Sequence, residues 1–224
     1  MRLDLGVREL TLKLVYYGPA LSGKTTNLRA VHRLASPETR GRLMTLGMRN
    51  ERTLFFDMLP IGITVGNGFR IRLKLFSVPG QLVHEPTRRL VLQDADGVAF
   101  IASSRRSEES TNRESFLRLH RNLQHNGVEP ARMPMVVQFN KRDLEDIHSD
   151  EDLATIETRS PEPIYKAVAT RGRGVMQTLH GLIRETWSRL EEEHHLEDRL
   201  GISPSSSMQA FESTLGNQTK WRSS

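Results

Sequence analysis

With 224 residues, of which 37% are hydrophobic and 26% charged, the chain is long enough for one sizeable core and has the composition of a soluble globular domain. Its 32 basic residues exceed the 27 acidic ones, but the two signs are interleaved along the whole length without accompanying aromatic residues, which disfavours a nucleic-acid groove. There is no cysteine, so disulfides and thiolate metal sites are excluded.

The first part of the sequence predicts a strand, a glycine loop and a helix, followed by a hairpin. Residues 9–17, ELTLKLVYY, have a strand pattern, and the loop GPALSGKTT leads into a helix that extends to about Leu34. After a polar stretch, residues 54–65 and 69–78 are predicted strands, and the Gly-Asn-Gly sequence between them is typical of a hairpin turn.

From residue 82 onward, predicted helices and strands alternate. We expect helices near 82–93, 108–125, 150–158 and from 174, and strands at 97–102, 134–139 and 163–169. Such alternation is typical of a parallel sheet covered on both faces. The prediction is therefore an α/β fold with a mostly parallel six-stranded sheet, helices on both faces and one antiparallel edge strand from the hairpin.

The end of the sequence is polar. Gly201 and Pro204 are expected to stop the last helix, and the following residues are rich in Ser, Gln and Asn, which favours disorder. The alternative is a short partner-binding helix with Met208, Phe211 and Leu215 on one apolar face. We assign residues 1–193 to the folded domain and residues 194–224 to a disordered tail.

The most specific motif is G-x-x-x-x-G-K-[ST], which lies between the first strand and the first helix, where a phosphate-binding loop belongs. The backbone N–H groups of such a loop point at phosphate oxygens, and the helix N-terminus adds positive potential. Lys24 would reach the β- and γ-phosphates, and the Thr25 hydroxyl would ligate Mg²⁺. The predicted nucleotide-binding residues here are Gly18, Pro19, Ala20, Leu21, Ser22, Gly23, Lys24, Thr25 and Thr26.

A second motif fits the guanine-reading sequence N-K-x-D of Ras-like GTPases. Asn140, Lys141 and Asp143 follow the apolar strand MVVQF. A carboxylate at Asp143 can accept hydrogen bonds from guanine N1–H and the 2-amino group, whereas adenine offers no such pair of donors. An ordinary polar turn after a strand is the alternative.

The sixth predicted strand ends in AVATRGRGV, where small GTPases place a loop whose alanine N–H meets the guanine carbonyl. Ala169 takes the alanine position and Val168 precedes it. A plain strand-to-helix turn is the alternative at this weaker motif.

Four sequence segments together resemble the bacterial MglA family of Ras-like GTPases over roughly residues 8–190; they are KLVYYGPALSGKTTNL, ERTLFFDMLP, VPGQ and QFNKRDL. The resemblance implies a P-loop small-GTPase fold, GTP or GDP as ligand with Mg²⁺, and a part in gliding motility or cell polarity. It also implies a Roadblock-fold GTPase-activating partner and motility or polarity effectors. In that family the Asp of Asp-x-x-Gly-Gln is absent, and here Ser77 stands at its position.

The residues around that motif are candidates for sensing and hydrolysing the γ-phosphate. Thr53 is the candidate second hydroxyl ligand of Mg²⁺, and Gly80 would offer its N–H to the γ-phosphate. Gln81 is placed to orient the attacking water, and Arg52 is the candidate arginine finger in cis. A solvated arginine beside Glu51 is the alternative for Arg52.

The sequence thus predicts a GTP-binding molecular switch with slow, partner-stimulated hydrolysis. One alternative is a GTP-loaded scaffold with negligible turnover, suggested by Ser77, and another is a P-loop phosphotransferase, which the guanine motif disfavours. Because we find no secretory pattern, apolar run of membrane length or lipidation motif, we expect a cytoplasmic protein that reaches a cell pole or membrane through its partners.

Overall fold

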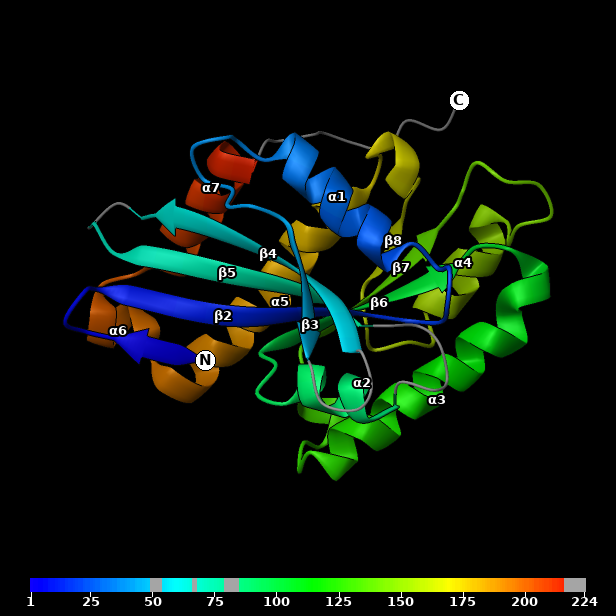
Figure 1. Ribbon diagram of the computed structural model, residues 1–224, viewed down its shortest axis with the longest axis horizontal. Coiled ribbons are helices and arrows are strands. Elements are labelled where there is room, and N and C mark those ends of the chain that lie inside the picture. The colour runs from blue at the N-terminus through cyan, green and yellow to red at the C-terminus, as the bar shows by residue number, and fades with distance from the viewer. Residues whose placement is uncertain (49–53, 66–67, 79–84, 216–224) are drawn as a thin grey trace.

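The computed structural model describes residues 1–48, 54–65, 68–78 and 85–215. These residues form one eight-stranded sheet with helices on both faces (Figure 1). The strands are β1 (Arg2–Asp4), β2 (Glu9–Tyr17), β3 (Met44–Met48), β4 (Leu54–Thr64), β5 (Arg70–Ser77), β6 (Gly97–Ser103), β7 (Met135–Asn140) and β8 (Ile164–Lys166). The α-helices are α1 (Lys24–Leu34), α2 (Glu85–Leu92), α3 (Glu109–His125), α4 (Asp150–Glu157), α5 (Val175–His194), α6 (Leu196–Leu200) and α7 (Pro204–Leu215).

The sheet has the order β3-β4-β5-β2-β6-β7-β8. Strands β5, β2, β6, β7 and β8 are parallel, so their carboxyl ends lie at one edge of the sheet. Strand β4 runs antiparallel to β5, and β3 runs antiparallel to β4. Strand β1 pairs with residues 9–11 of β2. It lies on the same edge of β2 as strand β6, which pairs with residues 14–17. Ligands of parallel α/β sheets bind outside the carboxyl ends of the strands, which is where the two predicted motifs lie.

The core has two apolar layers because the central strands are buried on both faces. Helices α1, α5 and α7 cover one layer, with Trp187, Leu179 and Phe211 among its buried side chains. Helices α2 and α3 cover the other layer, in which Phe100 and Leu119 are buried. In Figure 1 the first group lies above and behind the sheet, and α2 and α3 lie below it. Strand β5 shows alternating burial along its length.

The predicted α/β class, the mostly parallel sheet, the helices on both faces and the antiparallel edge are confirmed. The described residues form eight strands and not six, because β1 and β3 were not predicted. Strand β1 has three residues, too few to show a period, and β3 has the sequence MTLGM within a stretch whose overall composition is polar. Pairing with a longer neighbour, and not local sequence, makes these segments strands.

Residues 194–215, the described part of the predicted disordered tail, are folded, and the helix that forms at residues 204–215 was the alternative prediction; residues 216–224 lie outside the described residues. Helix α5 ends at His194, His195 adopts a left-handed conformation, and two further helices follow within residues 196–215. Helix α7 packs against α5 and β4, with Phe211 and Leu215 fully buried. Phe211, Leu215 and the partly buried Met208 dock this helix on the core, although the surrounding Ser-rich composition is typical of disorder.

Candidate functional site

The loop between β2 and α1 is folded tightly against the ends of two neighbouring strands. Gly18 and Gly23 have positive φ angles of 148° and 104°. A Cβ atom at Gly18 would lie 2.3 Å from the carbonyl oxygen of Ile101, and one at Gly23 would lie 2.2 Å from Nδ2 of Asn140. Both glycines of the motif are therefore required by crowding as well as by backbone conformation.

Lys24 begins α1 and is buried inside the loop. Its Nζ donates hydrogen bonds to the carbonyl oxygens of Gly18 at 3.0 Å and Pro19 at 2.6 Å. Burial, with a smaller contribution from the charge of Arg88 on α2, lowers the pKa of Lys24 from 10.5 to about 7. Arg88 is itself only 2% exposed. The buried ammonium of Lys24, whose two acceptors are neutral carbonyl groups, is a group that an anionic ligand would stabilise.

Next to Lys24, the Thr25 hydroxyl belongs to a network centred on Asp57 of β4. Oδ2 of Asp57 accepts hydrogen bonds from Thr25 Oγ1 at 2.6 Å and from Ser77 Oγ at 3.1 Å. Oδ1 of Asp57 accepts a hydrogen bond from Thr45 Oγ1 at 2.7 Å. The carboxylate thus joins α1, β5 and β3 through three hydroxyl groups. We did not select Asp57 from the sequence, although it is the one carboxylate within the apolar strand pattern of residues 54–65.

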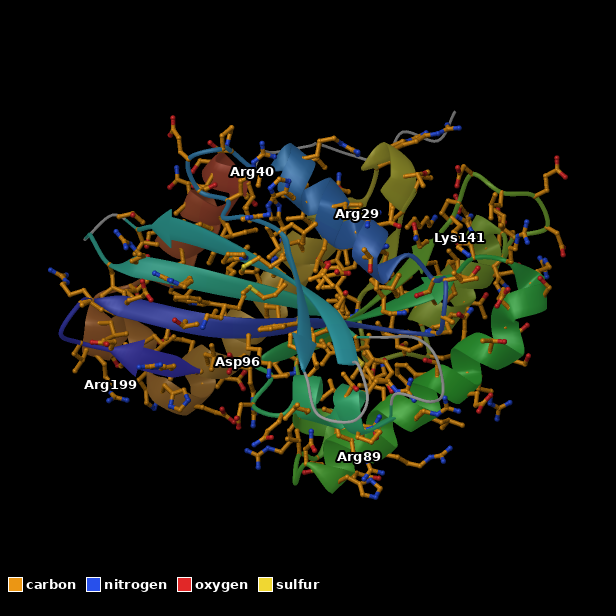
Figure 2. The ribbon with its side chains drawn as sticks, in the orientation of Figure 1. Arg29, Arg40, Arg89, Asp96, Lys141 and Arg199 are labelled. Carbon is orange, nitrogen blue, oxygen red and sulfur yellow. The ribbon has the colours of Figure 1, made fainter. Side chains whose placement is uncertain are left out.

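Asn140 connects the guanine motif to the phosphate loop. Its Nδ2 donates to the carbonyl oxygen of Ser22 at 2.8 Å, and its Oδ1 accepts from the N–H of Ala169 at 3.0 Å. Lys141 follows in a left-handed conformation with φ of 67°, and Asp143 is exposed at the end of the same turn. Figure 2 shows Lys141 at the end of the sheet where α1 begins. The structure therefore brings the two motifs together, more than 100 residues apart in sequence.

The backbone around Ala169 differs from the expected arrangement in one respect. We expected the N–H of Ala169 to face the guanine carbonyl, but in the structure it donates to Asn140. Val168 is buried, and its N–H donates to the carbonyl oxygen of Arg173 at 2.9 Å. Residues 169–171 form a short 3-10 turn, so the next N–H in this turn is that of Thr170.

Four candidate residues, Arg52, Thr53, Gly80 and Gln81, lie outside the described residues, and their roles stay predictions. The strands that flank them are described. Asp57 of β4 pairs directly with Ser77 of β5.

The phosphate loop at the carboxyl edge of a parallel sheet, the buried lysine and the adjoining N-K-x-D turn define a P-loop domain with a small-GTPase fold. No protein-family model matches the chain. The chain is 39% identical over 185 residues to the Mutual gliding-motility protein MglA of Myxococcus xanthus (strain DK1622), a match that covers 83% of this chain and 95% of that protein. At this identity and coverage, the chain belongs to the MglA family of small GTPases.

The small-GTPase family implies binding of a guanine nucleotide and Mg²⁺, and the residues of the site fit both ligands. Thr25, Ser77 and Asp57 present two hydroxyls and a carboxylate close together, and oxygen donors of this kind suit Mg²⁺. The buried Lys24 fits a phosphate group. Within the described parts of the chain, no helix is long and apolar enough to cross a membrane.

Proposed function

We propose that the protein is a GTP-binding molecular switch that hydrolyses GTP slowly to GDP and phosphate, is accelerated by a partner, and acts in gliding motility or cell polarity. The observation that supports this most directly is the placement of Lys24 and Asn140 on two sides of one loop. In this proposal Lys24 belongs to the phosphate end of the nucleotide site and Asn140 to its base end. Membership of the MglA family supports the same proposal.

At the base end, Asp143 is the proposed guanine reader. Its carboxylate is exposed beside the turn that Asn140 anchors, so it is accessible to the N1–H and 2-amino groups of guanine. For the guanine carbonyl, Thr170 N–H joins Ala169 N–H as a candidate donor, because the latter is bonded to Asn140 in this structure.

At the phosphate end, Lys24 would exchange its two carbonyl acceptors for phosphate oxygens, which restores a full counter-charge to its ammonium group. Thr25 and Thr53 are the proposed hydroxyl ligands of Mg²⁺. When bound, Mg²⁺ neutralises phosphate charge. Gly80 would donate its N–H to the γ-phosphate, Gln81 would orient the attacking water, and Arg52 would add positive charge in the transition state.

Closure of the segments that contain Arg52 and Gln81 is the step we assign to a Roadblock-fold GTPase-activating partner. Effectors of motility or polarity would then bind the GTP form, and recruitment to a cell pole would occur through such partners. The Ser77 hydroxyl adjoins Thr25 through Asp57, which is consistent with a metal site that functions without an aspartate at position 77.

The test uses the full chain, a fluorescent guanine nucleotide and single-turnover GTP hydrolysis with and without a Roadblock-fold partner. We expect guanine nucleotides but not ATP to compete for the site, and the partner to accelerate hydrolysis. Gln81→Leu and Arg52→Ala should each retain GTP binding and lose the acceleration, because their contacts belong to the transition state. Tight GTP binding without turnover under any condition would favour the scaffold, and selectivity for ATP would favour a phosphotransferase.

A further inference from the structure

A pocket of about 520 Å³ lies between the C-terminal half of α5 and the first half of α7. We call it the α5–α7 pocket. Trp187, Pro204 and Met208 give it apolar walls, and Glu191 and Glu192 are among its polar lining residues. In Figure 1, α6 and α7 lie at the left of the domain, whereas the loop before α1 lies at its right. The pocket has the volume of a typical ligand site but is separate from the proposed nucleotide site.

The indole ring of Trp187, which lines this pocket, has a buried N–H group without an acceptor. Trp187 is 1% exposed, and its Nε1 makes no hydrogen bond with any of the described residues. Buried side-chain donors are nearly always paired in folded proteins. A carbonyl group from outside the described ranges would complete this hydrogen bond.

The end of the pocket near His195 favours positive charge. Glu191 and Glu192 lie in the last turn of α5, where the helix dipole is negative. The Glu192 side chain is 67% exposed, and the guanidinium of Arg189 lies 3.7 Å from its carboxylate, so the group is accessible to a further cation. A ligand that combines an apolar ring with neighbouring basic groups fits both parts of the pocket.

We propose that the segment 216–224 of the same chain docks in the α5–α7 pocket. Its sequence, GNQTKWRSS, has one large apolar residue, Trp221, between two basic ones, Lys220 and Arg222. Trp221 packs between the apolar walls, and the two basic side chains lie near Glu191 and Glu192. This inference goes beyond the proposed nucleotide switch and does not depend on it.

The segment is long enough to reach the pocket. Helix α7 ends at Leu215, and Met208, which lines the pocket, lies seven residues earlier, or ~10 Å along the helix axis. Six residues separate Leu215 from Trp221, and an extended chain of this length spans ~20 Å. A tether this short also gives the segment an effective concentration in the millimolar range, an advantage over a separate basic peptide.

The absence of cysteine from the chain allows a direct test with two introduced cysteines. In the full chain, Ser188→Cys places one thiol in the pocket, and Ser223→Cys places the other two residues beyond Trp221. Mild oxidation should link them in an internal disulfide, detected by mobility on a non-reducing gel. The matched control combines Ser223→Cys with Gln209→Cys, which follows Met208 on α7 but is exposed and outside the pocket.

The two pairs distinguish a docked segment from a free one. A docked segment should link to Ser188→Cys at least about 10 times faster than to Gln209→Cys, because docking raises the effective concentration of the two thiols above that of a flexible tether. Trp221→Ser should remove this preference, and Gln218→Ser should preserve it. Similar rates for both pairs, with no effect of Trp221→Ser, would show that the segment does not occupy the pocket.

Charge is tested in the same Ser188→Cys background. Glu192→Lys should slow formation of the disulfide, whereas Glu185→Lys, on the same helix but outside the pocket, should not. The difference should shrink at high salt because exposed charges are screened. Equal rates in the two variants would overturn the placement of the basic residues beside the acidic end of α5.

Two further observations complete the test. Covalent dimers in place of the internal disulfide would mean that a second copy supplies the segment, which would overturn docking within one chain. The emission of Trp221, obtained as the difference between the parent and Trp221→Phe, should lie at short wavelength and resist quenching by iodide. Quenching equal to that of a free indole would contradict the inference. All measurements are made without nucleotide, so their result is independent of whether the proposed function holds.

Discussion

The side-chain Nδ2 of Asn140 donates a hydrogen bond of 2.8 Å to the carbonyl oxygen of Ser22, although the two residues are 118 positions apart in the chain. The other end of the same amide accepts the N–H of Ala169. One buried side chain thus sets the distance between the phosphate loop and the turns that we assign to the base. The site depends on this link before any ligand is present.

Replacement of Asn140 by alanine should therefore disturb the empty protein as well as nucleotide binding. The change leaves the Ser22 carbonyl and the Ala169 N–H without their partner, at a cost of about 1–3 kcal/mol per unsatisfied buried group. We expect a lower free energy of unfolding in denaturant titrations and weaker GDP binding. Parental values of both quantities would show that the loop is held by other contacts.

Exchange of Asp143 for asparagine should change base specificity without loss of the fold. An amide in place of the carboxylate loses the double acceptor for guanine and gains a donor that suits the extra carbonyl of xanthine. We expect GTP affinity to fall strongly and xanthosine triphosphate to bind, as measured by competition against a fluorescent nucleotide. Because Asp143 is exposed, the melting temperature of the empty variant should stay at the parental value. Unchanged GTP affinity would remove Asp143 from the site.

The lowered pKa of Lys24 predicts a dependence of stability on pH in the nucleotide-free protein. Burial lowers this pKa to about 7 in the folded state, whereas the unfolded chain has the ordinary value of 10.5. Between these two values the unfolded state binds more protons than the folded one, so the free energy of unfolding should rise with pH over this window. Lys24→Met removes the titrating group and should flatten that rise.

The same pKa predicts that nucleotide binding takes up a proton. Phosphate oxygens next to Nζ favour the charged ammonium, so the pKa of Lys24 should rise on binding. Calorimetry at pH 8 in buffers with different ionisation enthalpies should detect proton uptake in the parent and less in Lys24→Met. Binding heats of the parent that do not depend on the buffer would contradict this assignment.

Helix α7 should contribute to stability as part of the core. Phe211 is fully buried against α5, and removal of a buried phenylalanine side chain costs about 3–5 kcal/mol. We expect Phe211→Ala to lower the free energy of unfolding by an amount in this range. Gln209→Ala on the exposed side of the same helix is the matched control and should be nearly neutral. Equal stability of the two variants would mean that α7 detaches readily from the domain.

The sequence was most informative where a local pattern and the global fold agree. The alternation of strands and helices predicted the parallel sheet. Sequence motifs identified the loop 18–25 and the turn at Asn140, because the chemistry of such segments fixes residue type and spacing. The short strands β1 and β3 were missed, since each depends on a neighbouring strand and not on its own period. Helix α7 was predicted only as the alternative to disorder, because the Ser-rich composition of the tail outweighed its short apolar face.

Asp57 could not be found from sequence for a different reason. Its importance arises from the register of β4 against β5, which pairs it with Ser77, and register is a property of the folded sheet. A lone carboxylate in an apolar strand pattern is the only local sign of such a role. The hydrogen bond from the N–H of Ala169 to Asn140 could not be predicted either, because it depends on a side-chain rotamer that no motif specifies.

The contact between α5 and α7 also gives the protein an optical probe. Trp187 is 1% exposed, and its ring centroid lies 6.3 Å from that of Phe211. The other tryptophan, Trp221, lies outside the described residues, so Trp221→Phe would leave Trp187 as the sole emitter. Indole fluorescence shifts to longer wavelength when the ring enters water. Helix α7 also packs on β4, the strand of Asp57. The emission of Trp187 would therefore report in real time whether nucleotide binding or release at the pocket loosens the packing of α7 at the opposite end of the domain.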